Sequence, residues 1–228
     1  MTKTVSLSTN DHEDYIKYLP YVQKAWNALG WDTITFYLGG SNLESTDQNK
    51  IVKIESIGGI RDATVVQVSR LFAHKHADGL IMTSDVDMMP LSNYWKPDLD
   101  KFTCYGKDLT HGRHYPICYI SAPKFLWEQA IQETSIKELL LKYDQCKSNV
   151  FESWWFTDQD IITERLKNFK TKEIPRGFEG RFAYGRIDRD DWAYTKNISQ
   201  SKKIDAHMPR PFSQYEAENL VNKIGKLL

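Results

Sequence analysis

The stretch that decides the fold is Gly79–Asp87, which reads GLIMTSDVD. Its first part, Gly79–Ser84, is apolar or small throughout and predicts a strand buried in the middle of a sheet. Two carboxylates, Asp85 and Asp87, follow this strand directly. In extended backbone, residues two apart point to the same side. We therefore expect both carboxylates to face one side at the strand's carboxyl end.

The chain before this strand alternates between strands and helices. Apolar residues recur at spacings of three and four between Tyr15 and Leu29, which predicts a helix that Pro20 should kink or split. A second helix is predicted over Arg61–His76, and further strands over Thr4–Thr9, Thr33–Leu38 and Ile51–Ile57. This order is typical of an α/β fold with a mostly parallel, Rossmann-like central sheet flanked by helices.

The second half of the chain is less regular. The stretch Gly177–Asp191 mixes glycines and charges, which predicts a loop. We expect strands over Phe102–Tyr105, Pro116–Ser121 and Lys202–His207, and helices over Lys124–Glu133, Ile136–Tyr143, Asp158–Phe169 and Glu216–Leu228. No change in composition marks a boundary, so one domain is expected over residues 1–228.

Composition excludes several classes of protein. The 228 residues carry 30 Lys and Arg against 30 Asp and Glu, so the basic excess of a nucleic-acid coat is missing. No apolar run reaches the roughly 20 residues of a membrane span, and the N-terminus lacks the apolar stretch of a signal peptide. We therefore expect a cytoplasmic location, with no nucleic-acid partner and no membrane span. The three widely spaced cysteines are predicted to be free thiols.

The Asp85-Val86-Asp87 motif predicts a site for a divalent cation. Two carboxylates on one side repel each other unless a cation lies between them, and oxygen ligands suit Mg²⁺ or Mn²⁺. A pair of solvated aspartates in a turn is the simpler alternative. A calcium-binding loop of the EF-hand type is excluded, because its sixth and twelfth positions would be Pro90 and Lys96 rather than Gly and Glu.

A second motif combines aromatic and acidic residues. Trp154 and Trp155 lie just before Asp158-Gln159-Asp160. Acid and amide groups beside aromatic rings suit sugars, whose hydroxyls need hydrogen-bond partners and whose C–H faces stack on rings. Alternatively, Thr157 or Asp158 caps the next helix and the tryptophans belong to the core.

Basic residues and a histidine complete the candidate set. His207 could be a third metal ligand, and Arg210 could bind a diphosphate, although a lone histidine is more often structural. Arg61 and Arg70 precede the Asp85-Val86-Asp87 strand. Arg70 could neutralise phosphate or orient the first aspartate, or it could form a surface ion pair with Asp78.

Together these motifs resemble the nucleotide-sugar glycosyltransferases of the GT-A fold, along nearly the whole chain. A polar loop, Ser8–Asp11, follows the first strand, and Arg70 precedes the strand that ends in Asp85 and Asp87. The acid-amide-acid run Asp158–Asp160 opens a later helix, and His207 with Arg210 comes near the C-terminus. The order is most similar to the retaining galactosyltransferase and glycogenin-like group. The short chain also resembles compact capsid-glycan glycosyltransferases of large algal viruses.

The resemblance implies a function and a set of site residues. It implies transfer of a hexosyl or deoxyhexosyl group, with retention, from a nucleoside-diphosphate sugar such as a UDP-sugar to a glycan or glycoprotein. Residues 1–90 would form the nucleotide-binding half and residues 91–228 the half for sugar and acceptor. Mn²⁺ or Mg²⁺ would be held by Asp85, Asp87 and His207. Catalytic roles fall to Asp158, Gln159 and Asp160, and stacking of sugar or acceptor to Trp154 and Trp155. The nucleotide sugar would contact Thr9, Asn10, Asp11, Arg61, Arg70, Ser84, Asp85, Val86 and Arg210.

The chain departs from the group's pattern in two places. Thr163 stands where that group usually has Asn, and Pro209 and Arg210-Pro211-Phe212 replace its C-terminal Gly and Lys-Pro-Trp. Two other functions stay open beside the glycosyltransferase: a metal-dependent phosphatase, and a sugar-binding module without activity. The phosphatase motif usually has Thr or Val at the position of Met89 and usually follows a first strand rather than a fourth.

Overall fold

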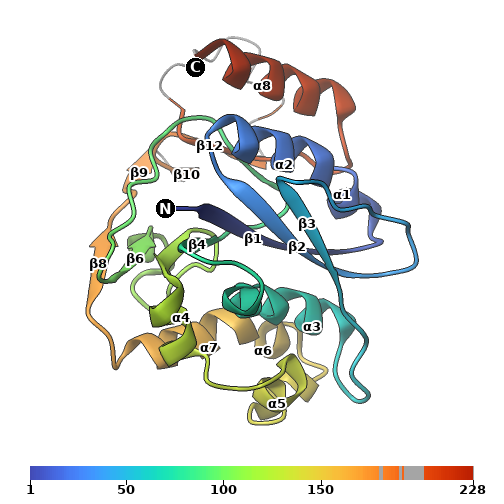
Figure 1. The fold of residues 1–228 in the computed structure, drawn as a ribbon, viewed down its shortest axis with the longest axis vertical. Helices are drawn as coiled ribbons and strands as arrows, with labels where there is room; N and C mark the ends of the chain where they lie inside the picture. The colour runs from blue at the N-terminus through green and yellow to red at the C-terminus, as the bar shows by residue number, and fades with distance from the viewer. Residues whose placement is uncertain (180–181, 190–191, 193–202, 228) are drawn as a thin grey trace.

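A seven-stranded sheet forms the centre of the molecule, in the order β3-β2-β1-β4-β7-β6-β8 (Figure 1). It belongs to a computed structural model that describes residues 1–179, 182–189, 192 and 203–227. Neighbouring strands are parallel except at β7, which is antiparallel to β4 and β6. The strands are β1 (Lys3–Asn10), β2 (Asp32–Leu38), β3 (Asn49–Lys53), β4 (Leu80–Thr83), β6 (Phe102–Tyr105), β7 (Ile120–Pro123) and β8 (Thr171–Ile174). The predicted α/β fold is confirmed, with the decisive strand, β4, in the middle of the sheet.

Helices cover both faces of this sheet, as Figure 1 shows. On one face lie α2 (Leu19–Ala28) and α8 (Gln214–Leu227), and on the other α3 (Asp62–Ser69), α4 (Lys124–Ala130) and α7 (Thr157–Leu166). The shorter helices are α1 (Glu13–Ile16), α5 (Ile136–Leu140) and α6 (Phe151–Trp155). Side chains of β4 alternate between the two cores: Leu80 and Met82 pack with the α2 and α8 side, and Ile81 with the other. This two-sided burial explains why β4 is apolar at every position.

A small second sheet connects the end of β4 to the C-terminal part of the chain. It has the order β11-β12-β5, with β5 at Met88–Pro90, β11 at Arg186–Ile187 and β12 at Asp205–His207. In the antiparallel β5–β12 pair, His207 is opposite Met88. The segment that follows Asp87 therefore lies beside His207, although 120 positions separate Asp87 from His207 in the sequence.

Several predicted elements differ in detail. The predicted helix between Tyr15 and Leu29 is split into α1 and α2, and Pro20 lies in the first turn of α2, as proline allows. The third strand is Asn49–Lys53 rather than Ile51–Ile57, because its pairing with β2 begins at Thr33 and Asn49. The predicted helix Arg61–His76 tightens after Ser69 into a 3-10 helix, Arg70–Lys75, as helix ends often do.

The prediction that Gly177–Asp191 is a loop is wrong for part of that stretch. It contains β11 and an antiparallel pair of strands, β9 (Phe178–Glu179) and β10 (Phe182–Ala183). Strands of two residues are too short to show an alternating pattern, and they form here because each finds a partner strand. Residues 180, 181, 190 and 191 of this stretch lie outside the described residues.

Two predictions about the whole chain can also be compared with the structure. Cys104, Cys118 and Cys146 are free, as predicted. No helix in the part of the chain that the structure describes has both the length and the apolar character needed to cross a membrane.

Candidate active site

A pocket of about 390 Å³ opens at the carboxyl ends of β1 and β4. Parallel sheets commonly bind ligands at this edge, because the loops that follow adjacent strands meet there. Most of the predicted site residues line this pocket: Thr9, Asn10, Arg70, Asp85, Val86, Asp87, Trp155, Asp158, Gln159, His207 and Arg210. Residues from the whole length of the chain therefore come together at one place.

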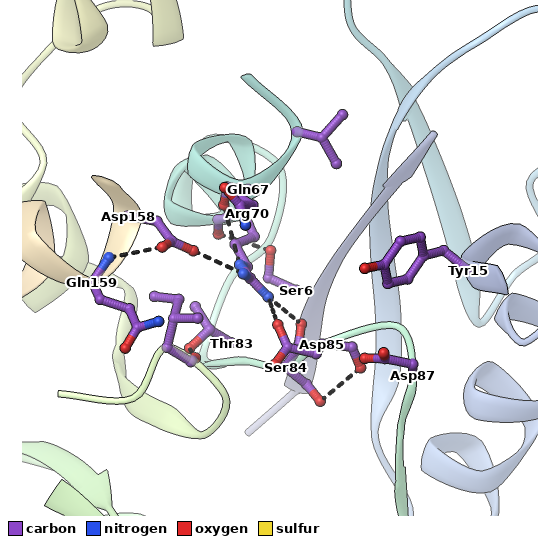
Figure 2. A network of polar contacts seen from close by, with 12 residues as sticks. Ser6, Tyr15, Gln67, Arg70, Thr83, Ser84, Asp85, Asp87, Asp158 and Gln159 are labelled. Atoms are coloured by element: carbon purple, nitrogen blue, oxygen red, sulfur yellow. Dashed lines mark hydrogen bonds and ion pairs between the residues drawn. The ribbon is translucent and has the colours of Figure 1, made fainter. Parts of the chain in front are cut away.

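Arg70 connects two of the predicted motifs (Figure 2). Its guanidinium forms an ion pair with Asp85 and another with Asp158, at 2.8 Å. It also donates to the carbonyl oxygens of Gln67 and Ser84, both at 3.1 Å, and its side chain is only 5% exposed. Burial alone would lower the pKa of Arg70, but Asp85 and Asp158 raise it above its ordinary value. Arg70 thus contacts the first aspartate, whereas Asp78, its predicted alternative partner, pairs with Lys124.

Both carboxylate oxygens of Asp158 accept hydrogen bonds that hold the side chain in this position. One accepts from Arg70, and the other accepts from the backbone N–H of Gln159 at 2.8 Å. Burial raises the pKa of Asp158, and Arg70 opposes that rise. The side chain thus fixes the start of α7 to Arg70, which leaves the neighbouring Gln159 among the residues that line the pocket.

Asp87 has a separate set of partners. Its Oδ2 atom lies 2.6 Å from Nη2 of Arg189, 2.9 Å from Nη2 of Arg210 and 3.6 Å from Nε2 of His207. Burial alone would raise the pKa of Asp87, but His207 and the two arginines hold it well below the usual range. Arg210 also donates to the hydroxyl of Tyr15 and lies over its ring, 4.4 Å from the centroid.

The expectation that both carboxylates face one side in extended backbone is wrong. The chain turns between Asp85 and Met88, whose N–H donates to the Asp85 carbonyl at 3.1 Å. In Figure 2 Asp85 lies beside Arg70, whereas Asp87 lies toward Tyr15. Both still line the pocket, but each carboxylate has its own cationic partners.

The predicted metal ligands fit a divalent cation in part of this arrangement. Nη2 of Arg189 is 2.6 Å from both Oδ2 of Asp87 and Nε2 of His207, so these two atoms converge on one point that a cationic group fills. A carboxylate oxygen and an imidazole nitrogen are donors that suit Mn²⁺. Asp85 is turned toward Arg70, and among the described residues no three His, Cys, Asp or Glu side chains are grouped closely enough to hold a metal ion.

No known family and no curated protein sequence matches the chain, but solved structures do. The galactosyltransferase LgtC, solved with donor and acceptor sugar analogs, is 13% identical, with 98% of this chain and 95% of that chain covered and a TM-score of 0.56. An active-site variant of LgtC is 12% identical, with the same coverage and a TM-score of 0.54. The glycosyltransferase GlyE of Streptococcus pneumoniae TIGR4 is 11% identical, with 98% and 63% covered and a TM-score of 0.56.

The chain has the fold of these glycosyltransferases. The predicted GT-A-like fold is thereby confirmed, over nearly the full length of LgtC and of this chain.

Five predicted site residues do not line the pocket, and two of them make local contacts at its edge. Asp11 accepts hydrogen bonds from Tyr37, from Ser41 and from the backbone N–H of Gly40, which lower its pKa to about 2. It therefore ties the loop after β1 to the loop after β2. Ser84 is buried, and its carbonyl oxygen accepts from Arg70.

The other three, Asp160 on α7, Trp154 on α6 and Arg61 just before α3, make their contacts outside the pocket. Asp160 accepts from Gln145 at 3.0 Å and lies 3.5 Å from His114. Residues two positions apart on a helix lie on different faces, so Asp160 cannot line the pocket beside Asp158. Arg61 donates to Asn149 at 3.1 Å and lies over the Trp154 ring, 5.1 Å from its centroid, so both stay outside the pocket while Trp155 lines it.

Sequence reasoning missed Arg189 and Tyr15. Arg189 belongs to the stretch predicted as a loop, where no periodicity marks it, and it reaches Asp87 only through the β11-β12-β5 sheet. Tyr15 was assigned to the apolar face of the first helix, yet its hydroxyl and ring face Arg210. An aromatic residue four positions after the predicted polar loop Ser8–Asp11 was the available signal.

Proposed function

We propose that the protein is a glycosyltransferase. It moves a hexosyl or deoxyhexosyl group from a nucleoside-diphosphate sugar, in the first place a UDP-sugar, to a hydroxyl group of a glycan or glycoprotein. The observation that carries this proposal is the gathering of Arg70, Arg189 and Arg210 with Asp85, Asp87 and His207 in one pocket at the carboxyl ends of β1 and β4. The fold shared with LgtC and GlyE supports it.

The diphosphate would bind on the Asp87 side of the pocket. Arg189 and Arg210 are partly exposed there, whereas Arg70 is buried and already paired with two carboxylates. Arginine binds phosphate oxygens through paired N–H groups, so these two side chains can receive the leaving diphosphate. Thr9 and Asn10, the last two residues of β1, lie at the same pocket and would contact the nucleoside.

A divalent cation, Mn²⁺ or Mg²⁺, would be held by Asp87 and His207, with Asp85 beside them. When bound, it stabilises the negative charge that develops on the leaving diphosphate. Oδ1 of Asp85 is paired with Arg70, so Oδ2 is the oxygen that is available to the nucleotide sugar.

The transferred sugar would lie between the diphosphate and α7. Gln159 offers an uncharged amide there, and Trp155 offers a ring on which an acceptor sugar can stack. The bond between the anomeric carbon and the phosphate oxygen breaks, and a bond to the acceptor oxygen forms. Both oxygens lie on one face of the sugar, so the acceptor's proton can pass to the released diphosphate, with retention at the anomeric carbon.

A thermal-shift series tests the proposal. UDP with Mn²⁺ should raise the melting temperature in a concentration-dependent way, and a ligand at 100 times its dissociation constant contributes about 2.7 kcal/mol. The control is Asp78→Asn, which removes an exposed acid outside the pocket and should respond like the parent. Incubation with UDP-sugars and glycans should then release UDP and form a glycoside.

Each competing function predicts a different result in these assays. A phosphatase would release inorganic phosphate without a sugar product, and a sugar-binding module would bind glycans without responding to UDP. Either result would overturn the proposal.

A further inference from the structure

We propose that Arg189 is a built-in cation that occupies the point between Asp87 and His207 in the ligand-free protein and gives way to the divalent cation when the donor binds. This inference rests on the proposed function, since it concerns the same pocket. It adds that the side chain of Arg189 blocks the metal site between Asp87 and His207 until the nucleotide sugar and the metal bind together.

The first support is the geometry around Nη2 of Arg189. This nitrogen is 2.6 Å from Asp87 Oδ2 and 2.6 Å from His207 Nε2, while those two atoms are 3.6 Å apart. Two ligands that each lie about 2.1 Å from one metal ion are about 3.0–3.6 Å apart, for angles of about 90–120°. The guanidinium therefore stands between two atoms that are already spaced as ligands of a single ion.

The second support is the surroundings of the imidazole. Nε2 of His207 faces Arg189 and Asp87, and Nδ1, on the other side of the ring, lies 3.8 Å from a carboxylate oxygen of Asp188. A metal-binding histidine has the same arrangement, with one nitrogen toward the ion and the other toward a carboxylate.

The third support is that Arg189 can move away without leaving Asp87 unpaired. Its side chain is partly exposed, and besides Asp87 and His207 it donates to the carbonyl of Met208 at 3.2 Å. Asp87 keeps Arg210 at 2.9 Å after such a movement. Exchange adds the two positive charges of the cation to the pocket and frees Arg189 for a phosphate. The gain in positive charge matches a diphosphate, so metal and donor should bind cooperatively.

The test measures Mn²⁺ binding to nucleotide-free protein through the electron paramagnetic resonance signal of free Mn²⁺. Arg189→Ala should bind Mn²⁺ at least about tenfold more tightly than the parent, because the point between Asp87 and His207 is open. The matched control is Arg210→Ala, which removes one positive charge from the same carboxylate oxygen without opening that point. Its affinity should change by less than about threefold.

A second arm adds UDP. The parent should then bind Mn²⁺ more tightly than without UDP, and the advantage of Arg189→Ala should shrink, because Arg189 of the parent now faces phosphate. Arg189→Met, which keeps the apolar stem, serves if the alanine variant does not fold. It should show the same tighter binding of Mn²⁺.

Three results would overturn the exchange. Equal Mn²⁺ affinity of the parent and the Arg189 variants would mean that Arg189 does not block the point. An equal increase in Mn²⁺ affinity in Arg189→Ala and Arg210→Ala would mean that the increase comes from the loss of one positive charge and not from opening the site. Absence of Mn²⁺ binding in every variant, with UDP still raising the melting temperature, would remove the cation but leave the glycosyltransferase proposal standing. The loss of the UDP response itself marks the failure of the proposed function.

Discussion

Asp85 and Asp87 are chemically identical and two residues apart, yet their surroundings differ. Arg70, the partner of Asp85, is buried and makes contacts with four groups, including Asp158. The side chains of Arg189 and Arg210, the partners of Asp87, are 25% and 31% exposed. A buried charge network resists rearrangement because any broken pair leaves an unpaired charge in the interior. The Asp85 side is therefore part of the framework, and the Asp87 side is open to exchange with a ligand.

The origin of each side in the sequence agrees with this difference. Arg70 and Asp85 flank β4 and are held by short connections, and the Arg70 carbonyl accepts from Ser6 in β1 at 2.8 Å. His207 reaches Asp87 only through the pairing of β12 with β5, two strands of three residues each. Short strands with few ladder hydrogen bonds can shift at lower cost than the central sheet.

The largest effect is expected on the Asp85 side, from Arg70→Met. This change leaves the carboxylate of Asp158 buried without its cationic partner, so the free energy of unfolding should fall by about 3–5 kcal/mol. Urea titration followed by fluorescence measures the loss. The matched variant on the other side, Arg210→Met, removes a partly exposed arginine and should cost less than about 1 kcal/mol. Comparable losses of unfolding free energy in the two variants would contradict the proposed difference between the Asp85 side and the Asp87 side.

A change on the Asp87 side should affect ligands more than folding. Asp87→Asn removes the charge that Mn²⁺ and the two arginines share, so the affinity for UDP in the presence of Mn²⁺ should fall about 100-fold, or about 2.7 kcal/mol. Isothermal titration calorimetry measures it, with the exposed Asp78→Asn as the control. Unchanged metal-dependent affinity would show that Asp87 is not at the diphosphate.

The Asp85 side was largely predictable from the sequence. An apolar run that ends in two acids marks β4 and its carboxyl end, and Arg70 stood out as a charge in an otherwise apolar turn. What the sequence could not reveal is the turn after Asp85, because the spacing of two residues predicts a shared direction only in extended backbone.

The Asp87 side was predictable only in part. His207 and Arg210 were predicted as candidate ligands of a metal and of a diphosphate, but Arg189 was not predicted, because β11 and β12 are too short to leave a periodic signal. Asp160 was expected beside Asp158, and the helical phase of α7 places it elsewhere. Tertiary pairing and helix phase, rather than residue type, decide these positions.

The strand β12, which carries His207, is expected to contribute less to the free energy of unfolding in acid. Asp205 on β12 is buried between Arg186 and Arg176. Burial alone would raise the pKa of Asp205, but the two arginines bring it down to about 2. A lowered pKa gives stability that is present above about pH 4 and is lost as the pH falls through about 2.

The change from 3.8 to about 2 corresponds to about 2 kcal/mol. Urea titrations of the parent and Asp205→Asn, made between pH 5 and pH 2, should show the gap between their unfolding free energies narrowing by about this amount. A gap that stays constant with pH would mean that the arginines do not hold the charge of Asp205.

The smallest effect is expected from Asp160→Asn. Asp160 is half-exposed, binds Gln145 and lies on the far side of α7 from Asp158, so removal of its charge should change sugar transfer at saturating donor by less than about threefold. Its neighbour Gln159 lines the pocket, and Gln159→Ala should lower turnover by about 100-fold with a smaller change in donor affinity. The two variants differ by one position in the same helix, so general damage to α7 would affect both alike. A large loss in Asp160→Asn with normal turnover in Gln159→Ala would place the reacting sugar on the opposite face of α7, and the pocket beside Asp85 and Asp87 would then not be the site of the chemistry.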